Sequence, residues 1–342
     1  MGPSLGAVSD VQTALRERLD LMNEHTAERL DRLNARLSQV GYAASLASKI
    51  GYKGDEENLL YRTLIGAEKP LSCTAAPVPL SSSLCQQVHF SLDQYRFWVE
   101  KMKDKPKYMR KQWEFFYIAQ ALFERDMLRA GRKGLGFGVG LEPLPALFAS
   151  LGVEILATDQ SYEHAKRAGW VRSNEHSTDL SGLNARGICT EAMFDRLVRF
   201  AEVDMNALPV DLRTRFDFCW SACALEHLGS LKHGAEFIKK SLDVLRPGGV
   251  AVHTTEFNLS SDERTIESEQ LSVYRRCDIE KLAREIESEG HTVEPIDWTH
   301  GSGLAEAVVD LPPWGRGEPH LRLLLGDFEC TSIALVVQRN AV

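Results

Sequence analysis

The sequence predicts an α/β fold in which a mostly parallel β-sheet is covered by helices on both faces. From about residue 110 onward, short apolar runs typical of strands alternate with the spacing of amphipathic helices. A glycine-rich turn at residues 133–143 leads from the first strand into a helix, and the next strand ends in Asp159. Glycine lets a backbone approach a ligand closely, and an acid at this place can accept hydrogen bonds from both hydroxyls of a ribose. This unit therefore predicts a nucleoside-binding site.

The individual elements follow from apolar periodicity and from glycine and proline breaks. We expect strands at residues 133–137, 153–158, 199–203, 216–220, 249–255, 291–297 and 331–338. We expect helices at residues 112–128, 144–151, 161–168, 191–197, 231–245 and 278–289, with a longer insertion at residues 169–190. The first helix carries an apolar face that should pack beside the first strand, made of Trp113, Phe116, Ile118, Ala119, Leu122 and Phe123.

The N-terminal part has a different pattern. Residues 9–40 predict one long helix, which Asp10 can cap and whose apolar residues keep a spacing of three and four. Its apolar stripe must be buried, either by self-association into a homo-oligomer or by packing on the rest of the chain. Residues 69–83 hold three prolines among serines and alanines, which is typical of a linker. We therefore expect an N-terminal helical region at 1–83 and an α/β domain at 84–342, with its core at 110–340.

Composition argues against several classes of protein. The net charge of −8 argues against a nucleic-acid partner, because binding a polyphosphate normally needs a positive surface. No apolar run reaches about 18 residues, so we expect no transmembrane helix, and the first residues lack the pattern of a signal peptide. The 7 scattered cysteines indicate reduced thiols rather than a disulfide framework. Together these features predict a cytoplasmic protein.

A basic cluster at residues 101–111 is the exception to the acidic composition. One interpretation is a solvated loop and helix start. The other is a docking surface for an acidic glycan, a nucleotide-sugar or a membrane headgroup. The sequence leaves both open.

The glycine-rich turn does not match the dinucleotide fingerprint G-x-G-x-x-G. In the three registers that begin at its glycines, the third glycine position holds Val139, Leu141 or Pro143. NAD and FAD therefore lose their main support. Pro143 and Pro145 are tolerated in a first helical turn, but they remove N–H donors that a pyrophosphate would use. A nucleoside without phosphates fits better, and S-adenosylmethionine is such a ligand.

Two downstream segments carry a family resemblance. Residues 216–221 (FDFCWS) with 224–228 (ALEHL) resemble the fourth strand and following turn of class I S-adenosylmethionine-dependent methyltransferases. Residues 242–252, which include the Arg-Pro-Gly-Gly turn, resemble the helix, turn and fifth strand of the same family. The resemblance covers roughly residues 110–340. Within the family, the chain also resembles bacterial methyltransferases associated with surface-polysaccharide synthesis. The family resemblance implies a Rossmann-like sheet of seven strands, the last inserted antiparallel, and S-adenosylmethionine as the cofactor.

The resemblance also implies which residues bind the cofactor. Gly134, Gly136 and Gly138 would form the loop beneath its methionine part. Asp159 would hold the ribose, with Gln160 beside the adenine. The alternative for the glycines is a generic tight turn.

Four further positions complete the implied cofactor pocket. Asp204 and Met205 match the place where the family contacts the adenine ring, and Ser221 and Ala222 would line the pocket from the fourth strand. For Asp204 the alternative is a turn residue or helix cap.

Two residues are candidates for the chemistry. His227 follows the fourth strand, where the family places residues near the transferring methyl group, and an imidazole can act as a base at neutral pH. Glu256 lies just past the expected fifth strand, where it could orient or deprotonate a hydroxyl, or bind a sugar. His253 should lie inside the strand with a structural role. A divalent metal near His253 and Glu256 is conceivable, but the spacing is not diagnostic and we expect none.

The acceptor is predicted less directly. Residues 310–314 (DLPPW) echo the motif by which amino-methylating enzymes hold an amine, but they lie before the last strand instead of after the fourth. Trp298, Trp314 and His320 could contact a sugar ring, or simply pack. We expect O-methylation of a sugar, glycan or small metabolite. The alternatives are a methyltransferase that acts on protein or RNA, and a non-catalytic scaffold that keeps the fold.

Overall fold

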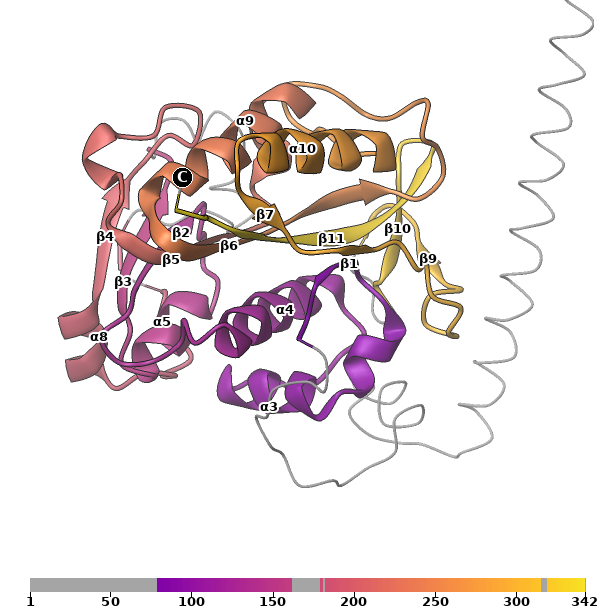
Figure 1. Cartoon of the computed structure of the whole chain (residues 1–342). Helices are drawn as coiled ribbons and strands as arrows, with labels where there is room; N and C mark the ends of the chain where they lie inside the picture. The colour runs from indigo at the N-terminus through magenta and orange to yellow at the C-terminus, as the bar shows by residue number, and fades with distance from the viewer. Residues whose placement is uncertain (1–78, 162–178, 181, 315–318, 342) are drawn as a thin grey trace, which may run out of the picture. The chain divides into compact units, whose positions relative to one another are not determined.

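A computed structural model describes residues 79–161, 179–180, 182–314 and 319–341 (Figure 1). The predicted helix at 9–40, most of the linker, nearly all of the helix expected at 161–168 and much of the insertion at 169–190 lie outside these residues. These expectations therefore stay predictions.

Five parallel strands form one side of the sheet, in the order β4–β3–β2–β5–β6. Their bounds are Lys133–Phe137 (β2), Glu154–Asp159 (β3), Val198–Glu202 (β4), Phe216–Ala222 (β5) and Leu245–Asn258 (β6). Strand β11 (Phe328–Gln338) then runs antiparallel beside β6, from Cys330 opposite Asn258 to Gln338 opposite Val250. The expected mostly parallel sheet, with the last strand inserted antiparallel, is confirmed.

The far side of the sheet differs from the expectation. A short strand that the sequence analysis did not predict, β1 (Ser82–Leu84), pairs antiparallel with β11 and parallel with β8 (Ile296–Asp297). The single strand expected at 291–297 is split into β7 (Thr292–Val293), which pairs with β11, and β8. Pro295 lies at the break, and its carbonyl accepts a hydrogen bond from the Ser82 amide at 3.1 Å. Proline has no N–H for a sheet ladder, so the strand leaves β11 here and β1 takes its place.

Helices cover both faces of the sheet (Figure 1). Helices α3 (Asp93–Lys101) and α4 (Arg110–Glu124) lie on one face, and α9 (Leu231–Ser241) and α10 (Arg276–Ser288) lie on the other. The shorter helical elements are η2 (Gln87–Ser91), α5 (Leu144–Ser150), α8 (Glu191–Leu197), η3 (Val210–Leu212), η4 (Leu225–His227) and η5 (Leu242–Val244). Two further strands, β9 (Val309–Asp310) and β10 (Arg322–Leu325), extend the sheet beside β11.

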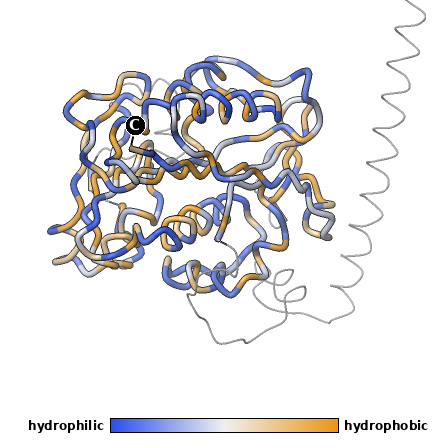
Figure 2. Tube along the Cα trace, in the orientation of Figure 1, coloured by the Kyte–Doolittle hydropathy of each residue, from blue (hydrophilic) through white to orange (hydrophobic). Residues whose placement is uncertain are grey.

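The sheet separates two apolar cores. Along β11, Ala334 and Val336 join the core beneath α3, α4 and α5, whereas Ile333, Leu335 and Val337 join the core beneath α9 and α10. Successive side chains of a strand point to opposite faces, so a strand covered on both sides is apolar throughout. Figure 2 shows orange stretches in the middle of the sheet, interrupted by white and blue. The predicted apolar face of α4 is confirmed, with Trp113 and Phe116 fully buried.

Candidate functional site

The loop after β2 contacts the acid at the end of β3. Gly138 and Gly140 have φ angles of 58° and 48°, in the left-handed region that favours glycine. The Gly140 amide donates a 3.0 Å hydrogen bond to Asp159 Oδ2, and the Gln160 amide donates one of 2.8 Å to Oδ1. Asp159 is buried, so its carboxylate has a fixed position beside the loop. A loop and an acid arranged in this way fit a nucleoside whose ribose lies between them.

Gly134 and Gly136 do not form that loop. Both lie within β2, where a side chain on Gly134 would overlap the Phe218 ring and one on Gly136 would overlap the Trp220 indole. These glycines therefore make room for two aromatic rings of the neighbouring strand β5. Their expected place in the loop is corrected. A direct contact between either glycine and a cofactor stays a prediction.

Gly138, Met205 and Ala224 converge at the carboxyl end of β2. A Cβ atom built on Gly138 would lie 2.8 Å from Ala224 Cβ and 3.6 Å from Met205 Sδ. Met205 is buried, whereas Asp204 is exposed and its Oδ1 accepts a 2.8 Å hydrogen bond from the Asn206 amide. Asp204 is therefore a turn residue, as in the alternative interpretation, and its contact with adenine stays a prediction.

Ser221 belongs to a buried chain of hydrogen bonds. Its Oγ lies 2.8 Å from His253 Nδ1, and His253 Nε2 lies 3.0 Å from Ser241 Oγ. Ser241 donates its own proton to the Ile238 carbonyl, so it accepts from Nε2–H. His253 is thus the Nε2–H tautomer, and Ser221 donates to Nδ1. The structural role expected for His253 fits this network. The hydroxyl of Ser221 is also engaged in it, within the sheet. Ala222 is buried at the end of the same strand.

The buried imidazole makes stability depend on pH. Burial lowers the pKa of His253 to about 3, against about 6.5 for an exposed histidine. Between these values the unfolded chain binds more protons, so stability contributed by neutral His253 is lost as the pH falls from about 6.5 toward 3. Denaturant titrations of His253→Gln should show a shallower fall, by up to about 1.4 kcal/mol per pH unit. Identical slopes for the variant and the wild type would contradict a neutral buried His253.

The carboxyl ends of β5 and β6 hold a buried cluster of charges. Arg110, at the start of α4, forms an ion pair of 2.5 Å with Glu256 Oε1 and donates a 3.1 Å hydrogen bond to Ser332. Glu114, one turn along α4, accepts hydrogen bonds from Ser332 at 2.6 Å and from the Cys223 thiol at 3.1 Å. Helix α4 thereby places two charged side chains over the edge of the sheet. At the end of the basic segment 101–111, Arg110 and Lys111 both pair with Glu114, at 3.8 and 3.2 Å, so this end is not only a solvated surface.

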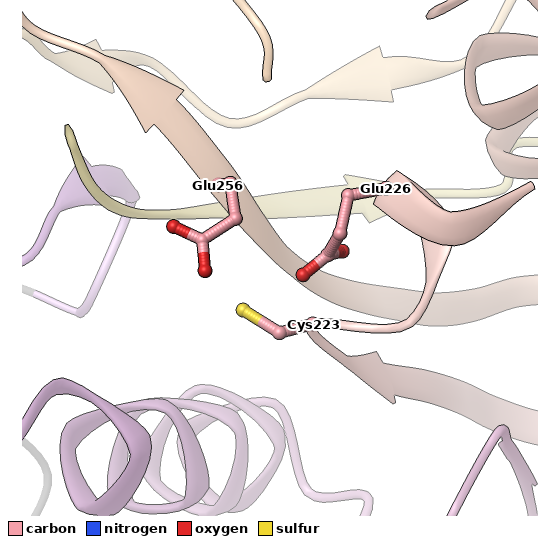
Figure 3. A group of neighbouring side chains, drawn as sticks. All are labelled: Cys223, Glu226 and Glu256. Carbon is pink, nitrogen blue, oxygen red and sulfur yellow. The ribbon is translucent and has the colours of Figure 1, made fainter. Parts of the chain in front are cut away.

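Three side chains of this cluster have the chemistry of metal ligands. Cys223, Glu226 and Glu256 point toward one another (Figure 3), and their ligand atoms lie within 4.8 Å of one another. In the described part of the chain no other group of histidines, cysteines and acids is arranged in this way. Glu256 already pairs with Arg110, and Thr255 Oγ1 donates to Glu226 Oε2 at 3.2 Å. The expectation of no metal stays a prediction.

Burial and neighbouring charges shift the pKa values in this cluster. Burial raises the pKa of Glu256 to about 7; Arg110 opposes the shift, and the carboxylates of Glu226 and Glu114 add to it. Burial also raises the pKa of the Cys223 thiol well above its usual range. For Glu114, burial raises the pKa, but Lys111 and Arg110 outweigh it and the pKa lies below its usual value. Glu256 Oε2 is buried and has no hydrogen-bond partner among the described residues.

His227 lies in η4, beside this cluster in the chain. Its Nδ1 lies 2.6 Å from the Gln270 carbonyl oxygen. A carbonyl can only accept, so Nδ1 carries the proton and the lone pair of neutral His227 is on Nε2. The ring therefore has the tautomer that a base requires at Nε2.

The aromatic residues near the last strand have structural partners. His320 Nδ1 lies 2.6 Å from Asp310 Oδ2, and the Trp314 indole donates to the Leu324 carbonyl at 3.0 Å. Trp298 packs on Phe257, with ring centroids 5.8 Å apart. These contacts agree with the packing interpretation of the three residues, while contact with a sugar stays a prediction.

No pattern in the sequence identified Arg110, Glu114, Cys223 or Glu226 as site residues. Arg110 and Glu114 are four apart on a helix that precedes the sheet, so nothing local indicates which strand ends they face. Glu226 stands directly before His227 in the turn after the fourth strand, and that position was an available signal. Gly140 was another, because it continues a series of three glycines at every second position.

Part of the chain is similar to a known protein family. Residues 134–253 match the family described as "Methyltransferase domain". None of the curated proteins matches the chain. Among solved structures, similar chains include the CurJ carbon methyltransferase (15% identity, 68% of this chain and 54% of that one, TM-score 0.38). A putative sarcosine dimethylglycine methyltransferase from Galdieria sulphuraria is similar too (18% identity, 57% of this chain and 65% of that one, TM-score 0.37). So is a putative methyltransferase from Bacillus halodurans (14% identity, 64% of this chain and 97% of that one, TM-score 0.39).

The chain spans about half the length of the first of these structures, 54%. The family match and the strand order give residues 134–253 a Rossmann-like methyltransferase fold. The cofactor of this domain is S-adenosylmethionine. The buried Asp159 and the left-handed glycines beside it are residues that fit its nucleoside.

Proposed function

We propose that this protein transfers the methyl group of S-adenosylmethionine to a hydroxyl of a small molecule, with sugars and glycans as the first candidates. The observation that carries the proposal is the buried carboxylate of Glu256 at the carboxyl end of β6. Strands β2, β3, β5 and β6 are parallel, so their carboxyl ends share the edge that holds Asp159 and the glycine loop. An acceptor held at Glu256 would lie at the same edge as the cofactor.

In the proposed reaction, Asp159 accepts hydrogen bonds from the ribose hydroxyls, and the amides of the loop after β2 line the cofactor. When bound, the cofactor supplies an electrophilic methyl group on its sulfonium. Glu256 Oε2 accepts a hydrogen bond from the acceptor hydroxyl and orients its oxygen for in-line attack. His227 Nε2 or Glu256 takes the proton that this hydroxyl loses. Arg110 holds Glu256 in place through Oε1.

The biological setting is part of the proposal. The resemblance to methyltransferases of surface-polysaccharide synthesis supports a glycan or its precursor as the acceptor, and a cytoplasmic location where such precursors are made. No helix in the described residues is long and apolar enough to cross a membrane. Self-association through residues 9–40 remains the proposed role of the N-terminal region.

Two measurements on the full-length protein test the proposal. Calorimetric titration should show binding of S-adenosylmethionine and none of NAD. Transfer of a labelled methyl group should then be detected with hydroxyl-bearing sugars or glycolipids in an acceptor panel that also contains amines, protein and RNA. Labelling of protein or RNA alone would replace the acceptor class. Cofactor binding without transfer to any acceptor would favour the scaffold, and absence of cofactor binding would overturn the proposal entirely.

A further inference from the structure

A basic groove lies at the opposite end of the parallel strands. It has a cavity volume of about 560 Å³, which is in the range of small-molecule sites. Its walls come from the first residues of β2, β3 and β5, from β4 and from the end of α8. The lining residues are Gly131, Lys133, Gly152, Glu154, Ile155, Leu156, Arg196, Leu197, Arg199, Arg215 and Phe216.

The chain topology explains why this part of the sheet is open. Strands β4 and β5 are connected by residues 203–215, whose only helical element is the single turn η3. In the sheet, β3 and β2 lie between β4 and β5. Three strand spacings separate Arg199 on β4 from the start of β5, a distance of roughly 14 Å. The groove therefore has arginines on two opposite rims, with β3 and β2 as its floor.

The charge of the groove is opposite to that of the chain. Lys133, Arg196, Arg199 and Arg215 line it. Among the described residues Glu154 is its one lining carboxylate, and it pairs with Lys133 at 2.9 Å. The three arginines form no ion pair with any residue in the described ranges. The whole chain has 48 acids against 40 lysines and arginines, so carboxylates are in excess. Three guanidinium groups around one cavity, without an acidic partner among the described residues, indicate an external anion.

Two of these arginines are anchored without being neutralised. Arg199 Nη1 donates to the carbonyls of Asp195 and Val198, at 2.7 and 2.8 Å. Arg215 Nη1 donates to the Asp211 carbonyl at 3.2 Å. A backbone carbonyl uses one nitrogen of a guanidinium and leaves its charge and other N–H donors for a ligand. A planar, partly fixed guanidinium is the donor best suited to a phosphate.

Part of the floor of the groove, beside the Lys133–Glu154 ion pair, is apolar. Ile155 and Leu156 of β3, Leu197 of α8 and Phe216 of β5 contribute aliphatic and aromatic surface between the two charged rims. Inorganic anions make no use of such a floor, whereas the carbon skeleton of an organic phosphate does.

We propose that this groove binds a small organic molecule with a phosphate group at each end, Arg196 and Arg199 receiving one phosphate and Arg215 the other. Parallel strands have their carboxyl ends together at one edge, so this site is separate from the cofactor edge. It is thus a second ligand site, independent of the proposed acceptor.

Calorimetric titration of the full-length protein with fructose 1,6-bisphosphate tests the proposal, since this probe has two phosphates and no nucleoside. We expect one site. Arg199→Gln and Arg215→Gln should each weaken binding about tenfold, because each removes charge-assisted hydrogen bonds. Glu154→Gln should strengthen it about threefold by removing the carboxylate and releasing Lys133. The matched control is Arg213→Gln, since Arg213 is exposed, pairs with Asp243 at 3.7 Å and does not line the groove.

Three outcomes would overturn this inference. The first is that the bisphosphate does not bind. The second is that Arg213→Gln lowers the affinity for the bisphosphate as much as the groove variants do. The third is that inorganic pyrophosphate binds as tightly as the bisphosphate. The last would mean that the span and the apolar floor are not used. All variants should bind S-adenosylmethionine as the wild type does, so failure of the groove and failure of the cofactor site give different results.

Discussion

Replacing Asp159 with alanine should lower the affinity for S-adenosylmethionine at least about 100-fold. The carboxylate is buried at the end of β3 and held by the amides of Gly140 and Gln160. Two ribose hydroxyls donating to an ionised carboxylate contribute about 1.5–3 kcal/mol each, and about 1.4 kcal/mol corresponds to a factor of ten. Calorimetric titration of both proteins measures the difference directly.

A matched control is available one strand away. Glu202 ends β4 and lies opposite Asp159 in the register, but it is exposed. Glu202→Ala should therefore leave the affinity for the cofactor unchanged. Thermal unfolding of each variant separates loss of the ribose contact from loss of the loop, since Asp159→Ala also removes the acceptor of the Gly140 amide. Equal affinity in Asp159→Ala and the wild type would mean that the ribose is bound elsewhere.

Replacing Glu256 with glutamine should lower the rate of methyl transfer by about 100-fold to 1000-fold, within the range for loss of a positioned proton acceptor. Glutamine keeps the shape of the side chain but removes its charge and its capacity to take a proton. The affinity for S-adenosylmethionine should change less than about threefold, because the proposed ribose contact is with Asp159. Single-turnover kinetics with a labelled methyl group measure the chemical step apart from product release.

Glu294→Gln is the control that removes an ion pair elsewhere in the protein, away from the proposed acceptor. Glu294 pairs with Arg125 at 3.2 Å, and both residues are only partly exposed. If Glu294→Gln and Glu256→Gln lower stability alike and neither changes the rate, the carboxylate of Glu256 is structural. A lower rate only in Glu256→Gln supports its place beside the acceptor.

The parts of the fold that could be predicted from the sequence are those with long local patterns. The central strands β2, β3 and β5 were expected within two residues of their bounds, because an apolar run between glycine and proline breaks is a local signal. Strand β1 has three residues, two of them serines, and becomes a strand only because β11 and Pro295 offer it hydrogen bonds. No pattern within three residues carries that information.

The candidate site residues divide in the same way, into those with a local sequence signal and those placed by tertiary contacts. Asp159 was selected as a candidate because it ends a recognisable strand, and its contact with the loop follows from the β-α-β order. Gly134 and Gly136 were expected in the loop but lie within β2, because the motif shows that a glycine is needed without showing which contact requires it. Here the reason is the Phe218 and Trp220 rings of a strand more than eighty residues later. Arg110 faces Glu256 for a similar reason, since only tertiary packing brings α4 over the end of β6.

The insertion of β1 between β11 and β8 has a consequence for the order in which the protein is made. Ser83 lies opposite Ala334, so the two strands are about 250 residues apart along the chain. A ribosome adds roughly 5–20 residues per second, so β1 must wait tens of seconds, unpaired, for its partner to emerge. The parallel strands can assemble during that time. Pairing of β1 with β11 then becomes one of the last steps of folding. The boundary expected at residue 83 falls inside β1. A truncated gene that starts there would yield a β11 edge open to pairing with other chains.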